Sequence, residues 1–322
     1  MNGPALSQTD AQLKGATTET TGTDKERTRP VNPLQGIAWM LVTMFMFSCI
    51  NATAKSLAQS LPVIEVVWAR YFFQMLLLIL FLRHRLPKVI ATGKLKLQIA
   101  RSLLLLITTL LFFTGLSKIP MADATSVMFV APILVTVLSL PILGERVGMR
   151  RWIGVLIGFL GAMIIIRPGM GMVQPAILFP LGAACFHSLY QLSTRFLSRT
   201  DSTLTTLIYS ASTGSIIMTI TVPFFWVTPS PSETALMVII GLFAALGHYC
   251  LIKAFEAAPP AIVAPFSYTN LLWATLFGFV LFSDLPDAWT IIGALIIAGS
   301  GLYIFHRERT HGDLDTPLEK TI

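Results

Sequence analysis

Long apolar segments recur along almost the whole chain, and they constrain its fold more than any other feature. A helix needs about 20 apolar residues to cross the hydrocarbon core of a bilayer, and irregular backbone must lie outside it. We therefore predict an all-α membrane protein with ten transmembrane helices. The expected spans are Leu34–Leu57, Pro62–Leu82, Leu97–Leu116, Ala124–Leu143, Trp152–Ile166, Ala176–Leu197, Leu204–Trp226, Ala235–Ala257, Ile262–Phe282 and Ala288–Phe305.

The composition excludes other classes for the chain as a whole. Of the 322 residues, 54% are hydrophobic and 12% are charged, whereas a soluble domain carries about 25% charged residues. Collagen, coiled coils and disordered proteins do not have this composition. Cys49, Cys185 and Cys250 lie inside apolar segments, so they indicate neither a disulfide framework nor a metal motif. We expect no metal and no cofactor.

The two ends of the chain differ from the rest. Residues 1–33 are rich in Thr, Gly, Ser and Gln, carry acids and bases in equal number, and contain no apolar signal-peptide core. Such a segment cannot offset its ordering entropy by burial. We expect a disordered cytoplasmic tail at 1–33 and a second cytoplasmic tail at 307–322.

The positions of the basic residues predict the orientation. The chain has 23 Lys and Arg. If ten spans are drawn, all but four of these residues fall on one side, the exceptions being Lys55, Lys118, Arg167 and the intramembrane Arg70. Basic loops stay in the cytoplasm. We therefore expect a multi-pass protein of the cell (inner) membrane with both termini in the cytoplasm. The net charge of +7 needs no nucleic-acid partner.

The two halves of the chain resemble each other at an offset of about 140 residues. Asn51–Lys55 then falls on Gln191–Arg195, and Glu145 falls on Asp284. Each half holds five spans, and because five is odd the halves have opposite orientations in the membrane. Inverted repeats around a site at the midplane are typical of secondary transporters.

The loop motif after the fourth span indicates a family. The segments Leu143–Arg146 and Arg150–Leu156, followed by Gly161 and Arg167–Gly169, resemble the EamA module of the drug/metabolite transporter superfamily. The second half looks like a degenerate copy, with Ser283-Asp284 in place of Gly-Glu.

This resemblance covers Leu34 to His306 and implies repeats at 34–169 and 174–306, each of five helices, with alternating access to a central cavity. Members of the superfamily move amino acids, vitamins such as riboflavin, S-adenosylmethionine, opine-type metallophores and other small metabolites. The compact bacterial branch with riboflavin-type carriers is the most similar of these.

Arg70 is the strongest candidate site residue. It lies eight residues after Pro62, about 12 Å deep in the second span, where an unpaired charge is costly. Gln74 shares its face of the helix, whereas Glu65 lies about 140° around it. Arg70 is predicted either to contact an anionic or carbonyl-rich part of the substrate or to tie backbone carbonyls of packed helices.

Further polar residues occupy the first, sixth and eighth spans. Asn51 and Gln191 hold matching positions in the two halves and are expected either at a midplane substrate site or in an interhelical hydrogen bond. His187 and Tyr190 lie beside Gln191, and His248 lies in the eighth span. These histidines could couple transport to protons or could simply be packed.

The ninth span adds Tyr268, Asn270 and Trp273. Aromatic rings with a few polar groups suit a flat organic ligand, although packing is the alternative. The predicted substrate-binding set is therefore Asn51, Arg70, Gln74, His187, Tyr190, Gln191, His248, Tyr268, Asn270 and Trp273, with no catalytic residue.

The predicted function is secondary active transport of a small organic metabolite. A vitamin such as riboflavin, an amino acid or a related compound is expected as substrate. The alternative is an exporter of amino acids, metallophores or drugs with the same fold. No nucleotide-binding loop, zinc-protease motif or serine-hydrolase motif is present, so a membrane enzyme or a channel fits less well. Small-residue pairs such as Gly154/Gly158 and Gly241/Ala245 serve helix packing or a homodimer, and lipid is an expected partner.

Overall fold

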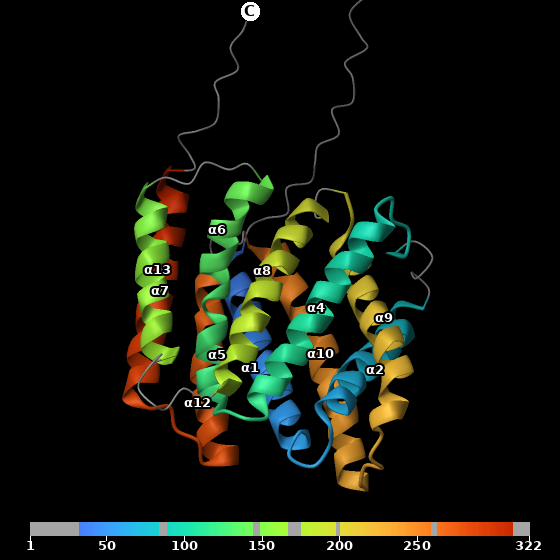
Figure 1. The fold of residues 1–322 in the computed structure, drawn as a ribbon. Coiled ribbons are helices and arrows are strands. Elements are labelled where there is room, and N and C mark those ends of the chain that lie inside the picture. The colour runs from blue at the N-terminus through green and yellow to red at the C-terminus, as the bar shows by residue number, and fades with distance from the viewer. Residues whose placement is uncertain are drawn as a thin grey trace, which may run out of the picture. The chain divides into compact units, whose positions relative to one another are not determined.

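The computed structural model describes residues 32–83, 89–143, 149–166, 175–197, 200–258 and 263–311, and within these ranges the secondary structure is helical without strands. The helices pack side by side (Figure 1). Their bounds are α1 Pro33–Leu57, α2 Val63–Leu82, α4 Leu95–Leu116, α5 Met121–Met128, α6 Ala131–Leu143, α7 Met149–Ile166, α8 Leu178–Leu197, α9 Thr203–Thr221, α10 Pro231–Ala257, α12 Thr269–Phe282 and α13 Ala288–His311, with short 3₁₀ helices η1 Pro175–Ile177, η2 Val222–Phe225 and η3 Ala264–Tyr268. The predicted tail at 1–33 falls almost wholly outside the described residues.

Six helical segments are long and apolar enough to cross a membrane, judged by length and composition. They correspond to α1, α2, α4, η1 with α8, α9 with η2, and α10. Four shorter apolar helices cover Met121–Val135, Leu156–Ile165, Phe266–Phe282 and Ala288–Ser300. These shorter helices overlap the remaining predicted spans, and a total of ten crossings stays a prediction. The helix α13 continues to His311, beyond the predicted end at Phe305.

The helices α1 and α10 each begin directly after a capping residue. Asn32 accepts a hydrogen bond from the Gln35 N–H at 3.1 Å, and Pro33 follows at the first helical position. Ser230 forms a capping box with Glu233, again with a proline next in the chain. Both arrangements satisfy N–H groups that have no partner inside the helix.

Two of the predicted spans are broken helices. The fourth is split into α5 and α6 at Phe129–Val130, just before Pro132, and the ninth begins as η3 around Pro265 before α12. Proline lacks the N–H that a continuous helix needs. The two breaks meet, because the Phe129 and Tyr268 rings pack edge to face with centroids 5.0 Å apart.

The most extensive helix contacts occur in matching pairs. α1 packs on α10 as α8 packs on α4, α2 packs on α10 as α9 packs on α4, and α1 packs on α12 as α8 packs on α6. The contacts α2–α9 and α7–α13 pair corresponding helices of the two halves. Exchanging the halves therefore leaves these two contacts unchanged, and α5 packs on α8 as η3 packs on α1.

Small residues allow close contacts within the chain. A Cβ added at Gly241 of α10 would lie 2.3 Å from the Phe73 Cβ of α2, and one added at Gly158 of α7 would lie 2.1 Å from Ile133. One residue of each predicted small-residue pair is thus used for packing inside the chain, and a homodimer stays a prediction.

We name the two ends of the helix bundle by α1. The first end is where α1 begins, α2 ends and α4 begins, and the second end is where α1 ends, α2 begins and α4 ends. Apolar side chains close the second end, and each of the five is at most 4% exposed: Leu57, Leu61, Val66, Leu116 and Met121.

Candidate substrate-binding site

A cavity of about 280 Å³ lies among α2, α4, α8, α9 and α10. Its polar lining includes Arg70, Gln74, Arg101, Tyr190, Asp201 and His248. Asp201 stands in the loop between α8 and α9, so the cavity reaches the first end of the bundle. Because α2 and α4 belong to the first half and α8, α9 and α10 to the second, both halves of the chain form its walls.

Arg70 lies at the inner part of this cavity and is 8% exposed. Its Nη1 donates to the Thr109 hydroxyl at 3.3 Å, and its guanidinium lies over the Tyr71 ring at 4.6 Å. Among the described residues no backbone carbonyl accepts from Arg70. Glu65 instead accepts from the Val227 N–H at 3.1 Å, as its position around the helix predicts.

Arg101 supplies a second guanidinium in the cavity. It was not predicted as a site residue, because it was counted with the loop charges. It is 2% exposed. Nε donates to Thr194 at 2.8 Å, Nη1 to the Thr206 carbonyl at 3.2 Å and to Ser210 at 3.1 Å, and Nη2 to the Tyr190 hydroxyl at 3.0 Å. The available signal was its place inside the predicted third span.

Gln74 and His248 complete the polar wall. Gln74 is 2% exposed, and no hydrogen bond reaches its amide from any described residue. His248 Nδ1 lies 2.8 Å from the Ala244 carbonyl oxygen. A carbonyl only accepts, so in the neutral ring Nδ1 carries the proton and Nε2 keeps a lone pair.

The structure brings four of the ten predicted site residues together at this cavity: Arg70, Gln74, Tyr190 and His248. The other six do not line it: Asn51, His187, Gln191, Tyr268, Asn270 and Trp273. Three of these six pack or bond elsewhere in the chain. Asn270 accepts from the Ser48 hydroxyl at 2.6 Å, Trp273 packs on Phe45, and Tyr268 packs on Phe129. The His187 ring stacks on Tyr190 with centroids 5.5 Å apart.

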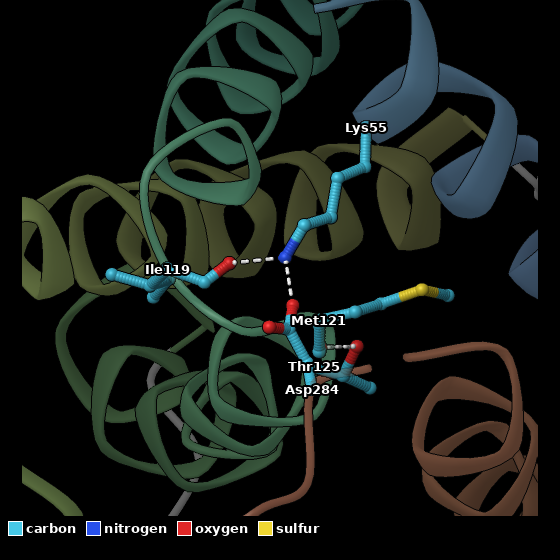
Figure 2. Close-up of polar contacts among 5 residues, drawn as sticks. All are labelled: Lys55, Ile119, Met121, Thr125 and Asp284. Atoms are coloured by element: carbon cyan, nitrogen blue, oxygen red, sulfur yellow. Dashed lines mark hydrogen bonds and ion pairs between the residues drawn. The ribbon is translucent and has the colours of Figure 1, made fainter. Parts of the chain in front are cut away.

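An ion pair joins the two halves at the second end (Figure 2). Lys55 Nζ at the end of α1 lies 2.5 Å from Asp284 Oδ2, donates to the Ile119 carbonyl at 3.0 Å, and lies over the Phe282 ring at 5.1 Å. No local sequence pattern predicts this pair, because 229 positions separate the two residues.

Local backbone geometry places Asp284 for this contact. Ser283 ends α12 with a left-handed φ of 56°. This turn lets the Asp284 N–H donate to the Gly278 carbonyl at 2.9 Å. A left-handed residue at this position is usually glycine, and the first half of the chain has Gly144-Glu145 where the second half has Ser283-Asp284.

Known proteins are similar to this chain over nearly all of its described residues. The model of the EamA-like transporter family matches twice, at residues 34–167 and 174–305. A solved crystal structure superposes with a TM-score of 0.61 at 18% identity, over 85% of this chain and 98% of that chain, which supports the fold alone.

Curated relatives are similar over most of their own length. An S-adenosylmethionine uptake transporter of Rickettsia felis is 30% identical over 277 residues, 86% of this chain and 94% of that protein. A riboflavin transporter of Vibrio cholerae is 30% identical over 285 residues, with 85% and 93% covered. The pseudopaline exporter CntI of Pseudomonas aeruginosa is 27% identical over 267 residues, with 81% and 93% covered.

The motif in the sequence, the paired helix contacts and both family matches agree. This chain is an integral membrane protein that belongs to the EamA-like transporter family.

Proposed function

We propose that this protein is a secondary active transporter that carries a small organic metabolite across the cytoplasmic membrane by alternating access. The observation that carries the proposal is the one-sided cavity. It reaches the first end at Asp201, whereas buried apolar side chains and the Lys55–Asp284 pair close the second end. A carrier that works by alternating access needs one state in which the site opens to the first end and another in which it opens to the second end.

The proposed transport unit has ten helices in two inverted repeats, 34–169 and 174–306. The matching of the most extensive helix contacts between the halves supports this arrangement, because a two-fold axis in the membrane plane gives a contact in one half a counterpart in the other. The two broken helices, each interrupted at an Ala-Pro step, add support, since paired interruptions of this type occur in the repeats of secondary transporters.

We propose that the first end faces the cytoplasm, with both termini on that side. The basic loops support this orientation. The structure therefore corresponds to an inward-open state, and the Lys55–Asp284 pair lies on the outer side.

The proposed substrate is a vitamin such as riboflavin, an amino acid or a related metabolite. The relatives named for S-adenosylmethionine uptake, riboflavin transport and pseudopaline export support this range. Since both uptake and export occur among them, export of amino acids, metallophores or drugs is the alternative. His248, which lines the cavity, is the residue through which proton coupling would act.

Transport by purified protein in sealed liposomes tests the proposal. Labelled riboflavin, S-adenosylmethionine and amino acids are offered in a counterflow assay, each with a cavity variant and a matched control. Leu105→Trp fills the cavity that Leu105 lines. Leu103→Trp places the same ring on the exposed face of the same helix, where Leu103 is 41% exposed.

We expect counterflow of at least one compound by the wild type and the Leu103→Trp variant, and its loss in the Leu105→Trp variant. Equal counterflow by both variants would exclude this cavity as the pathway. Absence of counterflow for every compound would contradict transport of these substrates.

A further inference from the structure

The two cavity arginines differ in how many of their N–H donors are used. A guanidinium has five N–H donors. Arg101 donates hydrogen bonds to four acceptors of the protein, and these bonds fix its orientation. Arg70 makes a single hydrogen bond with the described residues, the 3.3 Å contact to Thr109. Most of the Arg70 fork is therefore available to a ligand.

The cavity also lacks an acid that could neutralise Arg70. Among the lining residues that the structure describes, Asp201 is the sole acid. Its Oδ2 accepts from Thr92 and from Gln98, each at 2.6 Å. A buried guanidinium without a carboxylate is costly, especially inside a membrane, and an anionic ligand group would offset this cost.

Gln74 supplies the second polar contact. It lies one helical turn after Arg70, so the two side chains share a face of α2. Gln74 is 2% exposed and lines the cavity, and its amide makes no hydrogen bond among the described residues. An amide without a protein partner in a cavity wall can pair with a polar atom of a ligand.

The rest of the cavity wall is apolar, with Leu105, Leu207, Leu251, Ile252 and Phe255. A bare inorganic anion would leave these side chains without contacts. One free guanidinium edge beside a neutral amide matches a planar group with two oxygens and one charge. A phosphate dianion would need a second free cation, but the Arg101 donors are already engaged.

We propose that Arg70 and Gln74 bind the carboxylate of an organic acid whose carbon skeleton occupies the apolar part of the cavity. This inference rests on the proposed function and narrows its substrate to carboxylate-bearing metabolites such as amino acids. Arg101 in this proposal positions α4, α8 and α9 and does not bind the substrate.

Matched pairs of ligands and variants test this carboxylate anchor, which consists of Arg70 and Gln74. Thermal shifts of the purified protein are measured with leucine, methionine, phenylalanine and glutamate, each beside its C-terminal amide, for the wild type and for Arg70→Gln, Arg70→Lys and Gln74→Leu. Arg83→Gln is the control, because Arg83 is an exposed residue following the same helix.

We expect at least one acid to raise the Tm while its amide does not. Its apparent affinity should fall about tenfold or more in Arg70→Gln, since hydrogen bonds to a charged group contribute that much. Gln74→Leu should weaken binding less, Arg70→Lys should keep part of it, and Arg83→Gln should keep all of it. If Arg70→Gln does not fold, Arg70→Lys and Gln74→Leu still give the comparison.

The anchor is overturned if acids and amides shift the Tm equally, if binding persists in Arg70→Gln, or if no acid shifts the Tm. Counterflow of a compound without a carboxylate would leave transport standing while the anchor fails. If an acid binds in a manner that depends on Arg70 but no compound shows counterflow, the proposed transport is contradicted while carboxylate binding by Arg70 and Gln74 stands.

Discussion

At the scale of single residues, two buried arginines within one cavity are held in different ways. Arg101 connects α4 to side chains and a carbonyl of α8 and α9. Arg70 makes one hydrogen bond with the described residues, to Thr109, and lies over the ring of its neighbour Tyr71. Hydrogen bonds with a charged partner contribute about 1.5–3 kcal/mol each, so these two residues should differ strongly in their effect on stability.

Replacing Arg101 should destabilise the fold. Arg101→Gln removes the guanidinium donor from the hydroxyls of Thr194, Ser210 and Tyr190, whereas the Thr206 carbonyl keeps the Ser210 hydroxyl as a donor. We expect the free energy of unfolding to fall by about 3 kcal/mol or more. The Tm in detergent, followed by intrinsic fluorescence, measures the effect. Lys96→Gln, an exposed position of the same helix, should leave the Tm unchanged, and an equal Tm for both variants would contradict this role.

Asp201 should make stability depend on acid pH. Hydrogen bonds from Thr92 and Gln98, with help from Thr200 and Lys94, hold the pKa of its carboxyl below the usual value. The ionised carboxylate then stabilises the fold above about pH 4, and this stabilisation is lost as the pH falls through the folded-state pKa.

The variant Asp201→Asn should therefore have a lower Tm than the wild type at pH 7, and the difference should shrink below about pH 4. Thr92→Val, which removes one donor, should show the same trend with a smaller amplitude. A Tm difference that stays constant from pH 7 to pH 3 would rule out this linkage.

Sequence reasoning at this scale found residues that stand out against an apolar background. Arg70, Gln74, Tyr190 and His248 were identified because each is polar inside a span. Arg101 and Asp201 were missed because they lie near helix ends, where charges usually serve topology. Their roles arise from neighbours about 90 to 110 positions away, which no local pattern reveals.

At the scale of elements, close helix contacts depend on glycine. A Cβ at Gly241 of α10 would lie 2.9 Å from the Gln74 backbone N and 2.3 Å from Phe73. The packing of α10 on α2 therefore controls both stability and the position of Gln74.

Two Gly→Ala substitutions, one at a close helix contact and one in open space, distinguish the effect of packing on stability from the effect of helix propensity. Gly241→Ala should lower the free energy of unfolding by about 1–3 kcal/mol through overpacking. Gly299→Ala, where nothing lies within 4 Å of the added Cβ, should leave it unchanged or raise it slightly. Melting in detergent measures both, and similar effects at the two positions would contradict the packing argument.

Span positions were predicted better than helix continuity. Apolar length locates a helix, but it does not report where the backbone leaves α geometry. Pro132 and Pro265 were visible in the sequence, yet a proline is tolerated in a membrane helix when neighbours satisfy the freed carbonyl. Whether it breaks the helix depends on packing, here between Phe129 and Tyr268.

At the scale of the whole molecule, the Lys55–Asp284 pair and the cavity lie at opposite ends of the bundle. The pair joins α1 of the first half to the end of α12 in the second half. It forms only while these two ends are together. An opening at the second end must break it, so the pair should favour the closed state of that end.

Cysteine labelling tests whether the Lys55–Asp284 pair favours the closed state of the second end. In a variant without Cys49, Cys185 and Cys250, Met121→Cys places a thiol at a position that is 0% exposed in the closed second end. A membrane-impermeant maleimide should label it slowly. Lys55→Ala or Asp284→Ala should speed labelling severalfold, because the closed state loses its ion pair.

The double exchange Lys55→Asp with Asp284→Lys should restore slow labelling in part. The restoration is partial because an aspartate cannot donate to the Ile119 carbonyl as Lys55 does. Lys118→Cys, an exposed position at the same end, should label at one rate in every variant. If Met121→Cys labels equally with and without the pair while the Tm stays constant, the pair is a local tie, and closure of the second end rests on its apolar side chains alone.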